Sequence, residues 1–551
     1  MNYNRLAGLG KVASARQALS RIRDGSVVAV SGFNMSTTPE LLIEELYRLY
    51  KETGHPRGLF LISDTFPGAP GRGLDKVFED LYREGDEGFI NGILMPYLGW
   101  SKWLQKMVLE DRIEAYTWSI GVMAYWFREV GSGRPGVLTR VGLGTFFDPR
   151  MDGGYLNDKA RKRGRARVHL ITIDGDEYLL YTAPQPDVAL IRGSTADELG
   201  NLTMEDEAIY GTVLNIAQAT KAYPKKGLVV AQVLRVARYG SLNPKEVAVP
   251  GPLVDHIVVA PPDKHWQTAS IGYDPRIAGR IIPPISEDLV GRMPLSIRKV
   301  IARRVLLELV KLAVDEGRQI IVNLGVGIPS HVMQVAVEEK VDEVIATTIE
   351  SGPWGGVPLT GPDFGAAIGP YAIIQMPDQF AIYEGGVIDA ASLGFLQIDK
   401  EGNVNPSMLP GRLPGPGGFP VIISGAPRIY YAGGFTAGKR DIRVSNGRLH
   451  IVRDGEVVKF VEHVYKVFCP CKRMVEAGRD VLVITERAVF RMESSGLKLE
   501  EVAPGIDIER DIIGKMEFKP VIRGEPEEMP KEIFRPEPMR LRRLLEEAGK
   551  R

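Results

Sequence analysis

The sequence predicts an α/β fold built as two tandem domains of similar topology with mostly parallel sheets. Two observations lead to this prediction. The chain has 551 residues, 44% of them hydrophobic, which suffices for two or three domains that each bury a core. In addition, a unit of strand, glycine turn and helix occurs near residues 25–39 and again near 317–329.

Each unit follows the same plan. Residues 8–24 are typical of a helix, residues 25–30 of a strand that enters the turn Ser31-Gly32-Phe33-Asn34, and a second helix is expected from about Pro39. In the second unit, Gly317 precedes a strand that ends near Gly325, and Pro329 opens a helix. A weaker echo pairs residues 200–203 with residues 402–405, each a turn between apolar strands. We therefore predict two related halves.

The boundary between the halves is expected near Pro283-Pro284, where all periodicity stops. This gives an N-terminal domain over 1–285 and a C-terminal domain over 286–520, which opens with an amphipathic stretch at 296–316. Residues 521–551 are rich in proline and charge and are predicted to be a peripheral arm.

Composition excludes several classes of partner. The 69 basic and 69 acidic residues cancel, so no global field holds nucleic acid or an anionic membrane. The basic run at 159–167 lacks interleaved aromatic residues and is interpreted as a solvated loop, not a nucleic-acid patch. The N-terminus lacks an apolar targeting segment, and no run approaches the roughly 20 apolar residues of a membrane span. We expect a cytoplasmic protein.

The sequence predicts no metal site. The only cysteines, Cys469 and Cys471, form neither a disulfide framework nor a complete zinc site, and we interpret them as structural. The seven histidines show no spacing typical of metal ligands.

The candidate catalytic residue is Glu350. Residues 344–349 are typical of a buried strand of a parallel sheet, and open α/β folds place their chemistry at the carboxyl ends of such strands. The alternative is a solvated loop glutamate. The glycines and prolines of residues 352–365 favour the catalytic interpretation, since they permit unusual backbone angles and close approach of a ligand.

These residues carry a family resemblance. Glu350-Ser351-Gly352, followed by Gly355-Gly356, Pro358, Gly361 and Phe364-Gly365, resembles the active-site signature of family I coenzyme A transferases of the acetate and propionate (short-chain acyl-CoA:carboxylate) group. The stretch 138–150 is also similar, and the resemblance runs from about residue 5 to 520. It implies two α/β domains with the active site between them, acyl-CoA and small carboxylates as substrates, no tightly bound cofactor, and a homodimer or homotetramer.

The resemblance also implies roles for individual residues. Glu350 matches the covalent nucleophile, Gly417 and Gly418 match a turn whose amide serves the oxyanion hole, and Asn403 or Asn405 matches an active-site asparagine. Ser31, Gly32 and Phe33 match a turn beside the site. Gly385 and Gly386 are included as substrate-binding candidates, and Lys439 as a candidate for the phosphates of CoA, since it follows a glycine at a strand end.

One position departs from the family. The family usually has a Pro-Gln-Gly turn whose glutamine donates to the oxyanion, and the aligned residues here are Ser119-Ile120-Gly121. Isoleucine cannot donate a hydrogen bond. Either half of the oxyanion hole is lost, or Ile120 lines an acyl pocket and another donor replaces the glutamine.

The expected chemistry is CoA transfer with ping-pong kinetics. Glu350 must be ionised to attack a thioester, so it is not expected to be a general acid with a raised pKa. An acyl-CoA hydrolase would use the same residues, and a non-catalytic or isomerase-like relative of the fold is a further alternative. A serine hydrolase is disfavoured because the chain contains no Gly-x-Ser-x-Gly.

Overall fold

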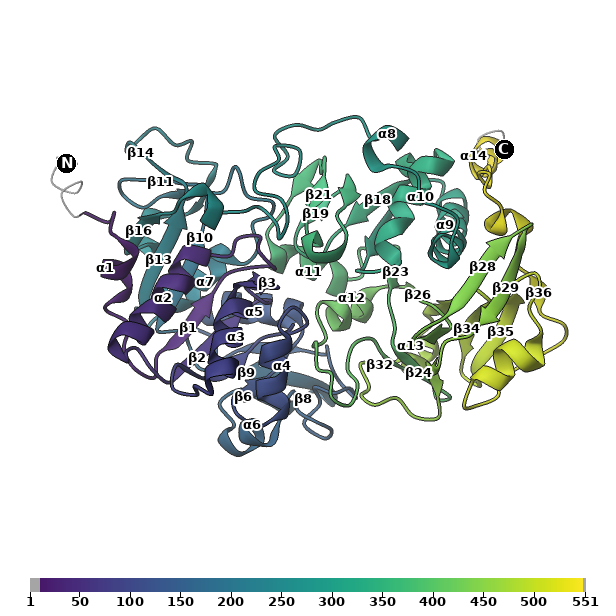
Figure 1. The fold of residues 1–551 in the computed structure, drawn as a ribbon, viewed down its shortest axis with the longest axis horizontal. Coiled ribbons are helices and arrows are strands. Elements are labelled where there is room, and N and C mark those ends of the chain that lie inside the picture. The colour runs from purple at the N-terminus through teal and green to yellow at the C-terminus, as the bar shows by residue number, and fades with distance from the viewer. Residues whose placement is uncertain (1–9, 549–551) are drawn as a thin grey trace.

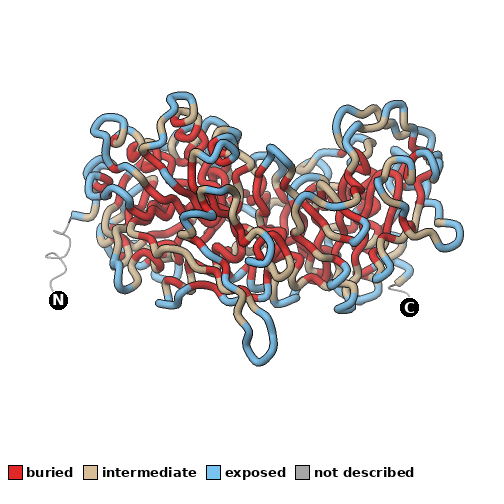
Figure 2. The backbone as a smooth tube through the Cα atoms, turned by 90° about the horizontal axis from the view of Figure 1, so that it is seen from below, coloured by how far each residue is buried: buried red, intermediate tan, exposed pale blue. Residues whose placement is uncertain are grey.

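The structure, a computed structural model, describes residues 10–548. Figure 1 shows two lobes side by side, the N-terminal half in purple to teal and the C-terminal half in green to yellow. Buried backbone runs through the interior of both lobes, and exposed backbone is mostly in loops (Figure 2).

The N-terminal half is built on a seven-stranded parallel sheet in the order β16-β13-β10-β1-β2-β5-β6. Its central strands are short and apolar and are buried on both faces, as covered parallel sheets require. The strands are β1 (Val27–Val30), β2 (Leu59–Ser63), β5 (Ile90–Leu94), β6 (Glu114–Tyr116), β10 (Val188–Arg192), β13 (Leu228–Val233) and β16 (His256–Val259).

The C-terminal half has a ten-stranded sheet whose parallel centre runs β18-β17-β23-β26-β33. This order repeats β2-β1-β10-β13-β16 of the first half, which confirms the prediction of two domains of similar topology. The strands are β17 (Ile320–Leu324), β18 (Ile345–Thr348), β23 (Ala390–Leu393), β26 (Arg428–Ala432) and β33 (Asp480–Ile484), flanked by β19 (Pro353–Trp354), β22 (Ala372–Ile373), β34 (Ala488–Glu493), β35 (Gly496–Val502) and β36 (Glu527–Glu528).

A smaller four-stranded sheet is also repeated. The order β14-β11-β12-β15 in the first half corresponds to β31-β24-β25-β32 in the second, with the same sequence of parallel and antiparallel pairs. These strands are β11 (Thr195–Asp197), β12 (Leu202–Thr203), β14 (Arg235–Ala237), β15 (Val247–Val249), β24 (Gln397–Asp399), β25 (Asn403–Asn405), β31 (Phe460–Val461) and β32 (Cys469–Pro470).

The remaining elements cover the sheets and connect them. The α-helices are α1 (Ala15–Leu19), α2 (Glu40–Thr53), α3 (Leu74–Glu84), α4 (Lys102–Leu109), α5 (Ile120–Gly131), α6 (Asp158–Arg163), α7 (Val213–Lys221), α8 (Glu287–Val290), α9 (Ile297–Glu316), α10 (Val332–Glu339), α11 (Met376–Glu384), α12 (Phe419–Gly425), α13 (Cys471–Glu476) and α14 (Arg542–Ala548). The small hairpins and sheets are formed by β3 (Gly68–Ala69) with β4 (Arg72–Gly73), β7 (Val137–Thr139) and β8 (Arg167–Ile173) with β9 (Asp176–Thr182), β20 (Val357–Pro358) with β21 (Ala367–Ile368), β27 (Thr436–Ala437) with β30 (Val457–Val458), and β28 (Asp441–Ser445) with β29 (Arg448–Arg453).

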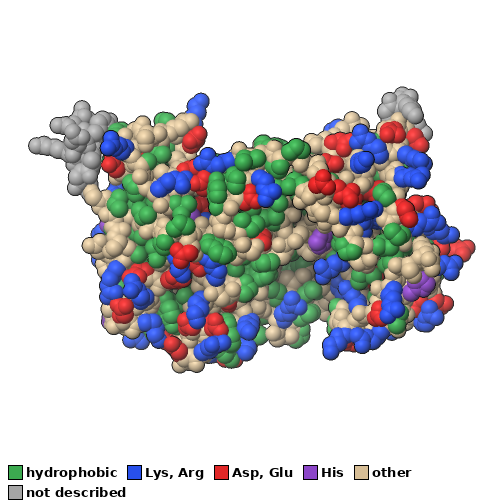
Figure 3. Space-filling view, turned by 45° about the horizontal axis from the view of Figure 1, so that its top comes forward, with side chains coloured by type: hydrophobic (Ala, Val, Ile, Leu, Met, Phe, Trp, Pro, Cys, Tyr) green, Lys and Arg blue, Asp and Glu red, His purple; other side chains and the backbone are tan. Residues whose placement is uncertain are grey.

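Two local expectations differ from the structure. The helix predicted over 8–24 is shorter in the structure, where α1 begins after its N-cap Ser14 and ends at Leu19. Residues 8 and 9 of the predicted helix lie outside the described residues. The basic run contains the short helix α6, not just a loop, with Asn157 as its N-cap. Its Arg165 pairs with the buried Glu114 at 2.6 Å. On the face drawn in Figure 3, basic and acidic side chains are interspersed.

The C-terminal segment is not a peripheral arm. Strand β36 pairs with β35, and Met529, Ile533 and Phe534 are fully buried in the second hydrophobic core. The buried Arg303 of α9 donates to backbone carbonyls of this segment, including those of Arg535 at 2.5 Å and Glu537 at 2.8 Å. The segment completes the C-terminal domain because it satisfies a buried cation and covers apolar surface.

The two halves meet through helix α5 on one side and helices α11 and α12 on the other. They approach so closely that a Cβ on Gly121 of α5 would lie 2.6 Å from a ring carbon of Phe380 and 2.7 Å from a methyl of Val421. Glycine is therefore required at this position by packing. This contact fixes the first turn of α5 against the C-terminal half.

Candidate active site

A cavity of about 350 Å³ lies between the halves and is lined by residues of both. Its walls are largely aromatic and aliphatic, and among the described residues that line it, Glu350 and Arg412 are the charged ones. The cavity contains five predicted site residues, Phe33, Ile120, Glu350, Gly417 and Gly418. It therefore brings together residues that are hundreds of positions apart in the sequence.

Glu350 lies on a tight turn after β18. The strand ends at Thr348, earlier than predicted, and the Ile349 amide donates to the Pro353 carbonyl at 3.0 Å as the chain reverses into β19. Gly352 has φ of +126°, and a Cβ there would lie 2.1 Å from the Ile374 carbonyl oxygen, so only glycine fits this turn. The turn projects the Glu350 side chain into the cavity.

The Glu350 carboxylate has no hydrogen-bond partner within residues 10–548, although the residue is half-buried in the cavity wall. Burial raises its pKa to about 7. The expectation that the pKa of Glu350 is not raised is therefore wrong, because the apolar walls penalise the charge and no donor within the described residues compensates. At neutral pH, a substantial fraction of the carboxylate is still ionised and available as a nucleophile.

Gly417 and Gly418 form the wall beside Glu350. A Cβ on Gly418 would lie 2.2 Å from Glu350 Oε2, so the absence of a side chain makes room for the carboxylate. The Gly417 amide donates to the Pro96 carbonyl at 3.2 Å, and the Gly417 carbonyl accepts from the Ile120 amide at 2.9 Å. No acceptor for the Gly418 amide lies within the described residues. Of the two amides, that of Gly418 is the one free to bind a ligand.

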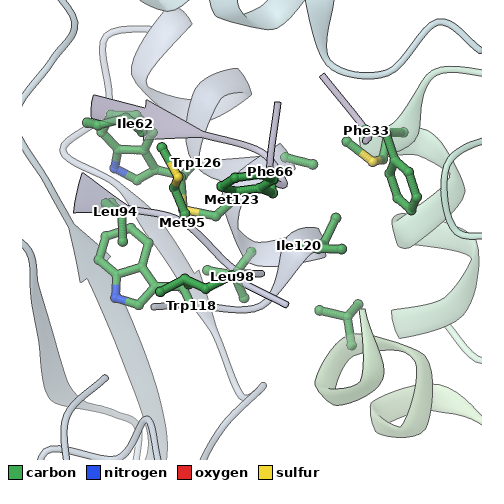
Figure 4. Packing of buried hydrophobic residues seen from close by; sticks show 14 of the residues in the cluster. Phe33, Ile62, Phe66, Leu94, Met95, Leu98, Trp118, Ile120, Met123 and Trp126 are labelled. Atoms are coloured by element: carbon green, nitrogen blue, oxygen red, sulfur yellow. The ribbon is translucent and has the colours of Figure 1, made fainter. Parts of the chain in front are cut away.

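Ile120 begins helix α5 and is 3% exposed. Its amide is bound to Gly417, while its side chain contributes to the cavity wall. Figure 4 shows Ile120 and Phe33 pointing from the N-terminal half toward helices of the C-terminal half. The position where the family has a glutamine therefore presents an apolar surface to the ligand.

Phe33 lines the cavity, whereas Ser31 and Gly32 shape the turn that carries it. The Ser31 hydroxyl donates to the Thr37 carbonyl at 2.7 Å. Gly32 has φ of +148°, and a Cβ there would lie 2.1 Å from Thr38 Oγ1. Both residues are structural in this position, and Phe33 is the one that can touch a ligand.

The two asparagines predicted for the site are not on the cavity wall. Asn403 donates its amide to Asp399 Oδ2 at 3.1 Å in the turn between β24 and β25. Asn405 is buried and donates to Gln397 Oε1 at 2.9 Å and to the Met408 carbonyl at 2.5 Å. Their hydrogen bonds are used within the protein, and Asn405 supports the adjoining loop, whose Ser407 does line the cavity.

Gly385, Gly386 and Lys439 also lie outside the cavity wall. Gly385 caps α11, and Gly386 packs against Gly425 at the end of α12. Lys439 is exposed in the connection between β27 and β28. Glycine-rich turns have the same sequence signature whether they border a ligand or a helix end, which is why these candidates could not be separated by sequence.

Cys469 and Cys471 are buried beside each other, with Sγ atoms 2.7 Å apart and the Tyr431 hydroxyl 3.5 Å from Cys471. Between residues 10 and 548, no group of three or more His, Cys, Asp or Glu side chains is arranged to hold a metal ion. In the same range, none of the helices has the length and apolarity to span a bilayer.

The sequence interpretation missed Asn34. Its Oδ1 accepts from Trp100 Nε1 at 2.6 Å, and its Nδ2 donates to the carbonyls of Phe364 at 3.0 Å and Pro362 at 3.2 Å. Asn34 thus joins two loops of the N-terminal half to the glycine-rich segment after Glu350. Its φ of +56° is typical of asparagine in a turn, which is the available sequence signal.

Comparisons with known proteins identify the family of the chain. A profile described as coenzyme A transferase matches residues 12–260. The chain is 38% identical to a caffeate CoA-transferase of Acetobacterium woodii over 533 residues, which cover 96% of this chain and 98% of that protein. The chain belongs to the coenzyme A transferase family. It is an enzyme of the CoA-transferase class, as the sequence motifs predicted.

Other members of the family are similar over the full length. The acetate CoA-transferase YdiF of Escherichia coli (strain K12) is 36% identical over 96% of both chains. The crystal structure of the acyl-CoA transferase YdiF apoenzyme from Escherichia coli O157:H7 superposes with a TM-score of 0.86, at 34% identity over 96% of this chain and 97% of that chain. The same transferase has been solved as a thioester complex with CoA, with the same TM-score and 34% identity over 97% and 98% of the two chains.

Proposed function

We propose that the protein transfers CoA from a short-chain acyl-CoA to a carboxylate acceptor, with Glu350 as the covalent nucleophile. The observation that carries the proposal is an unpartnered carboxylate facing an apolar cavity between the halves, next to a glycine with a free amide. The thioester complex of the similar E. coli transferase supports CoA as the group transferred.

The proposed first half-reaction has two steps. A Glu350 carboxylate oxygen attacks the thioester carbonyl, the carbon–sulfur bond breaks, and CoA leaves as a thiolate, which gives an acyl-glutamyl anhydride. The thiolate then attacks the glutamyl carbonyl and releases the first carboxylate, leaving a glutamyl-CoA thioester. The second carboxylate reverses both steps, so electrons balance with no net proton transfer, and ping-pong kinetics follow.

The Gly418 amide is the proposed donor to the tetrahedral oxyanions. It borders the Glu350 carboxylate and has no other acceptor in the described part of the chain, whereas the Gly417 amide is committed to Pro96. A fixed donor in a cavity with little water stabilises developing negative charge without reorganisation. The apolar walls also protect the anhydride and thioester from hydrolysis.

The test is intact mass spectrometry after incubation with acetyl-CoA. Wild type should gain the mass of CoA less water. Borohydride should reduce this thioester adduct and so inactivate the enzyme. Glu350→Gln should show neither adduct nor exchange. Glu384→Gln is the matched control because Glu384 is half-buried in another pocket, where it accepts from Thr139 Oγ1 at 2.5 Å. Exchange without an adduct would exclude the covalent role. Release of free acid without an acceptor as the main activity would instead indicate an acyl-CoA hydrolase.

Two further properties remain predictions. We propose a cytoplasmic enzyme, and we expect it to form a homodimer or homotetramer as the resemblance implies. Light scattering coupled to gel filtration measures the mass of the assembly. A mass of one chain, 60.7 kDa, would contradict the second expectation.

A further inference from the structure

Arg412 stands out among the residues that line the cavity. Within the described residues, it is the only cation on a wall otherwise made mostly of apolar side chains and backbone. Arg412 is exposed, so it marks the rim, whereas Glu350 lies deep inside. The cavity therefore has a nucleophile at its inner part and a positive charge at its opening.

The guanidinium is not paired with any carboxylate between residues 10 and 548, and in that range the hydrogen bonds of Arg412 are those of its backbone. Other arginines at the interface are paired, for example Arg128 with Asp378 at 2.5 Å. The charge of Arg412 also reaches into the cavity. Burial raises the pKa of Tyr97, and the positive charge of Arg412 opposes that rise. An unpaired arginine at the mouth of a site is suited to an anionic ligand.

The backbone at Arg412 is held in place. The amides and carbonyls of Leu409 and Arg412 exchange two hydrogen bonds of 2.9 Å across a tight turn. The following residues are tied to the N-terminal half, because the Leu413 amide donates to Gln105 Oε1 at 3.0 Å and the Leu98 amide donates to the Pro414 carbonyl at 2.6 Å. The side chain is therefore presented from a fixed base at the interface of the halves.

We propose that Arg412 binds phosphate groups of the acyl-CoA substrate at the rim of the cavity. The proposal rests on the proposed function and deepens it. The thioester would reach Glu350, the pantetheine arm would pass the apolar wall that includes Leu393 and Phe395, and the phosphates would stay at the exposed end. Lys439, the candidate suggested by the sequence, lacks this placement because it does not border the cavity.

The experiment compares Arg412→Gln with Lys439→Gln and with the charge-conserving Arg412→Lys. Calorimetry with free CoA should give a Kd raised about tenfold or more in Arg412→Gln, the size expected for loss of a charge-assisted contact. Arg412→Lys should recover part of that loss, and Lys439→Gln should bind CoA as wild type does. Raising the salt concentration should reduce the difference in Kd for CoA between wild type and Arg412→Gln.

A second donor identifies the anion. With acetyl-pantetheine, a thioester that lacks the phosphates, Arg412→Gln and wild type should have equal kcat/KM. An equal loss with both donors would overturn the proposal and assign Arg412 to the carboxylate acceptor. An unchanged Kd for CoA would also overturn it. Because CoA binding requires no covalent adduct, weaker binding in Arg412→Gln would support this site even if Glu350 formed no adduct.

Discussion

The two halves share a strand order, yet each places a carboxylate differently after equivalent strands. In the N-terminal half, Asp64 directly follows β2, is 1% exposed and accepts from the Ser63 hydroxyl at 3.3 Å. In the C-terminal half, Glu350 lies two residues beyond β18 and faces the cavity, with no hydrogen-bond partner in the part of the chain that the structure describes. Burial raises both pKa values, to about 6 for Asp64 and about 7 for Glu350.

A raised pKa alone does not distinguish the two acids. Both carboxylates lie just beyond the end of a parallel strand, where open α/β folds place their chemistry. Access to the cavity distinguishes them. Glu350 lines the cavity, whereas Asp64 does not and only its neighbour Thr65 does. The repeat therefore supplies two similar positions, and the turn of the C-terminal half opens one of them to a ligand.

After loss of the Glu350 carboxylate itself, Gly418→Ala should lower the exchange rate most, because it displaces that carboxylate. The added Cβ would lie 2.2 Å from Glu350 Oε2 and 2.8 Å from its Cδ, so the carboxylate must move. A displacement of about 1 Å in a reacting group costs on the order of a hundredfold in rate. We expect kcat for acetyl-CoA:carboxylate exchange to fall by about this factor.

Gly394→Ala is the matched control for Gly418→Ala. Gly394 lines the same cavity, and a Cβ there would meet only the Val326 carbonyl oxygen, at an ordinary 3.8 Å. Its exchange rate should stay near that of wild type. Equal losses in the two variants would show that cavity volume matters, rather than the position of Glu350.

Ile120→Gln tests what the N-terminal half contributes to the cavity that holds Glu350 of the other half. Ile120 is almost fully buried in the cavity wall, which favours the acyl-pocket hypothesis over a missing oxyanion donor. A polar amide there should lower kcat/KM for butyryl- and phenylacetyl-CoA by about 10- to 100-fold, with a smaller loss for acetyl-CoA. A uniform gain across the three donors would instead mean that the glutamine restores a lost oxyanion contact, and no change in any would show that position 120 does not face the reacting group.

The fold was predictable because it depends on local patterns that occur twice. Apolar strands such as β1 and β17, each followed by a glycine turn, and the turns at Asn201 and Asn403 identified two halves of one topology. Glu350 could be proposed as a cavity residue because glycines and prolines follow it and because Glu350-Ser351-Gly352 resembles the family signature. The cavity wall was not, because residues such as Asn34 and Arg412 enter it only through the contact between the halves. That contact has no periodic signature in the sequence.

Glu350 and Asp64 can be compared directly through the pH dependence of the unfolding free energy. The folded-state pKa of Glu350 is above its ordinary value, so the folded protein holds the proton more tightly than the unfolded chain. Stability is therefore lost as pH rises from about 4 to about 7. The loss of unfolding free energy is on the order of 2 kcal/mol, once it is reduced to allow for the exposure of Glu350 to the cavity. Relative to wild type, Glu350→Gln should gain about this much between pH 5 and pH 8, measured by urea denaturation.

Asp64→Asn should also gain unfolding free energy relative to wild type as pH rises, since burial raises the pKa of Asp64 as well. The gain should be complete nearer pH 6, the folded-state pKa of Asp64. It should retain exchange activity, unlike Glu350→Gln, because Asp64 is closed off from the cavity. Loss of exchange in a folded Asp64→Asn protein would contradict the distinction between the covered and the open carboxylate.

The smallest expected effect lies where the halves are most alike. Asn201 donates to Asp197 Oδ2 at 2.8 Å, and Asn403 donates to Asp399 Oδ2 at 3.1 Å, in matching turns. Asn201 Oδ1 also accepts from the Gly251 amide at 2.8 Å. Each hydrogen bond contributes about 1 kcal/mol, so Asn201→Ala should lose about 2 kcal/mol of unfolding free energy and Asn403→Ala about 1 kcal/mol.

Exchange kinetics complete the test of these turns. If Asn403 is structural, Asn403→Ala should keep the kcat of wild type at a temperature where both are folded, as Asn201→Ala should. A fall in kcat confined to Asn403→Ala, with no matching loss in Asn201→Ala, would return Asn403 to the catalytic role that the family resemblance implies. The equivalent turn of the N-terminal half is the internal control, because it has the same carboxylate–amide contact.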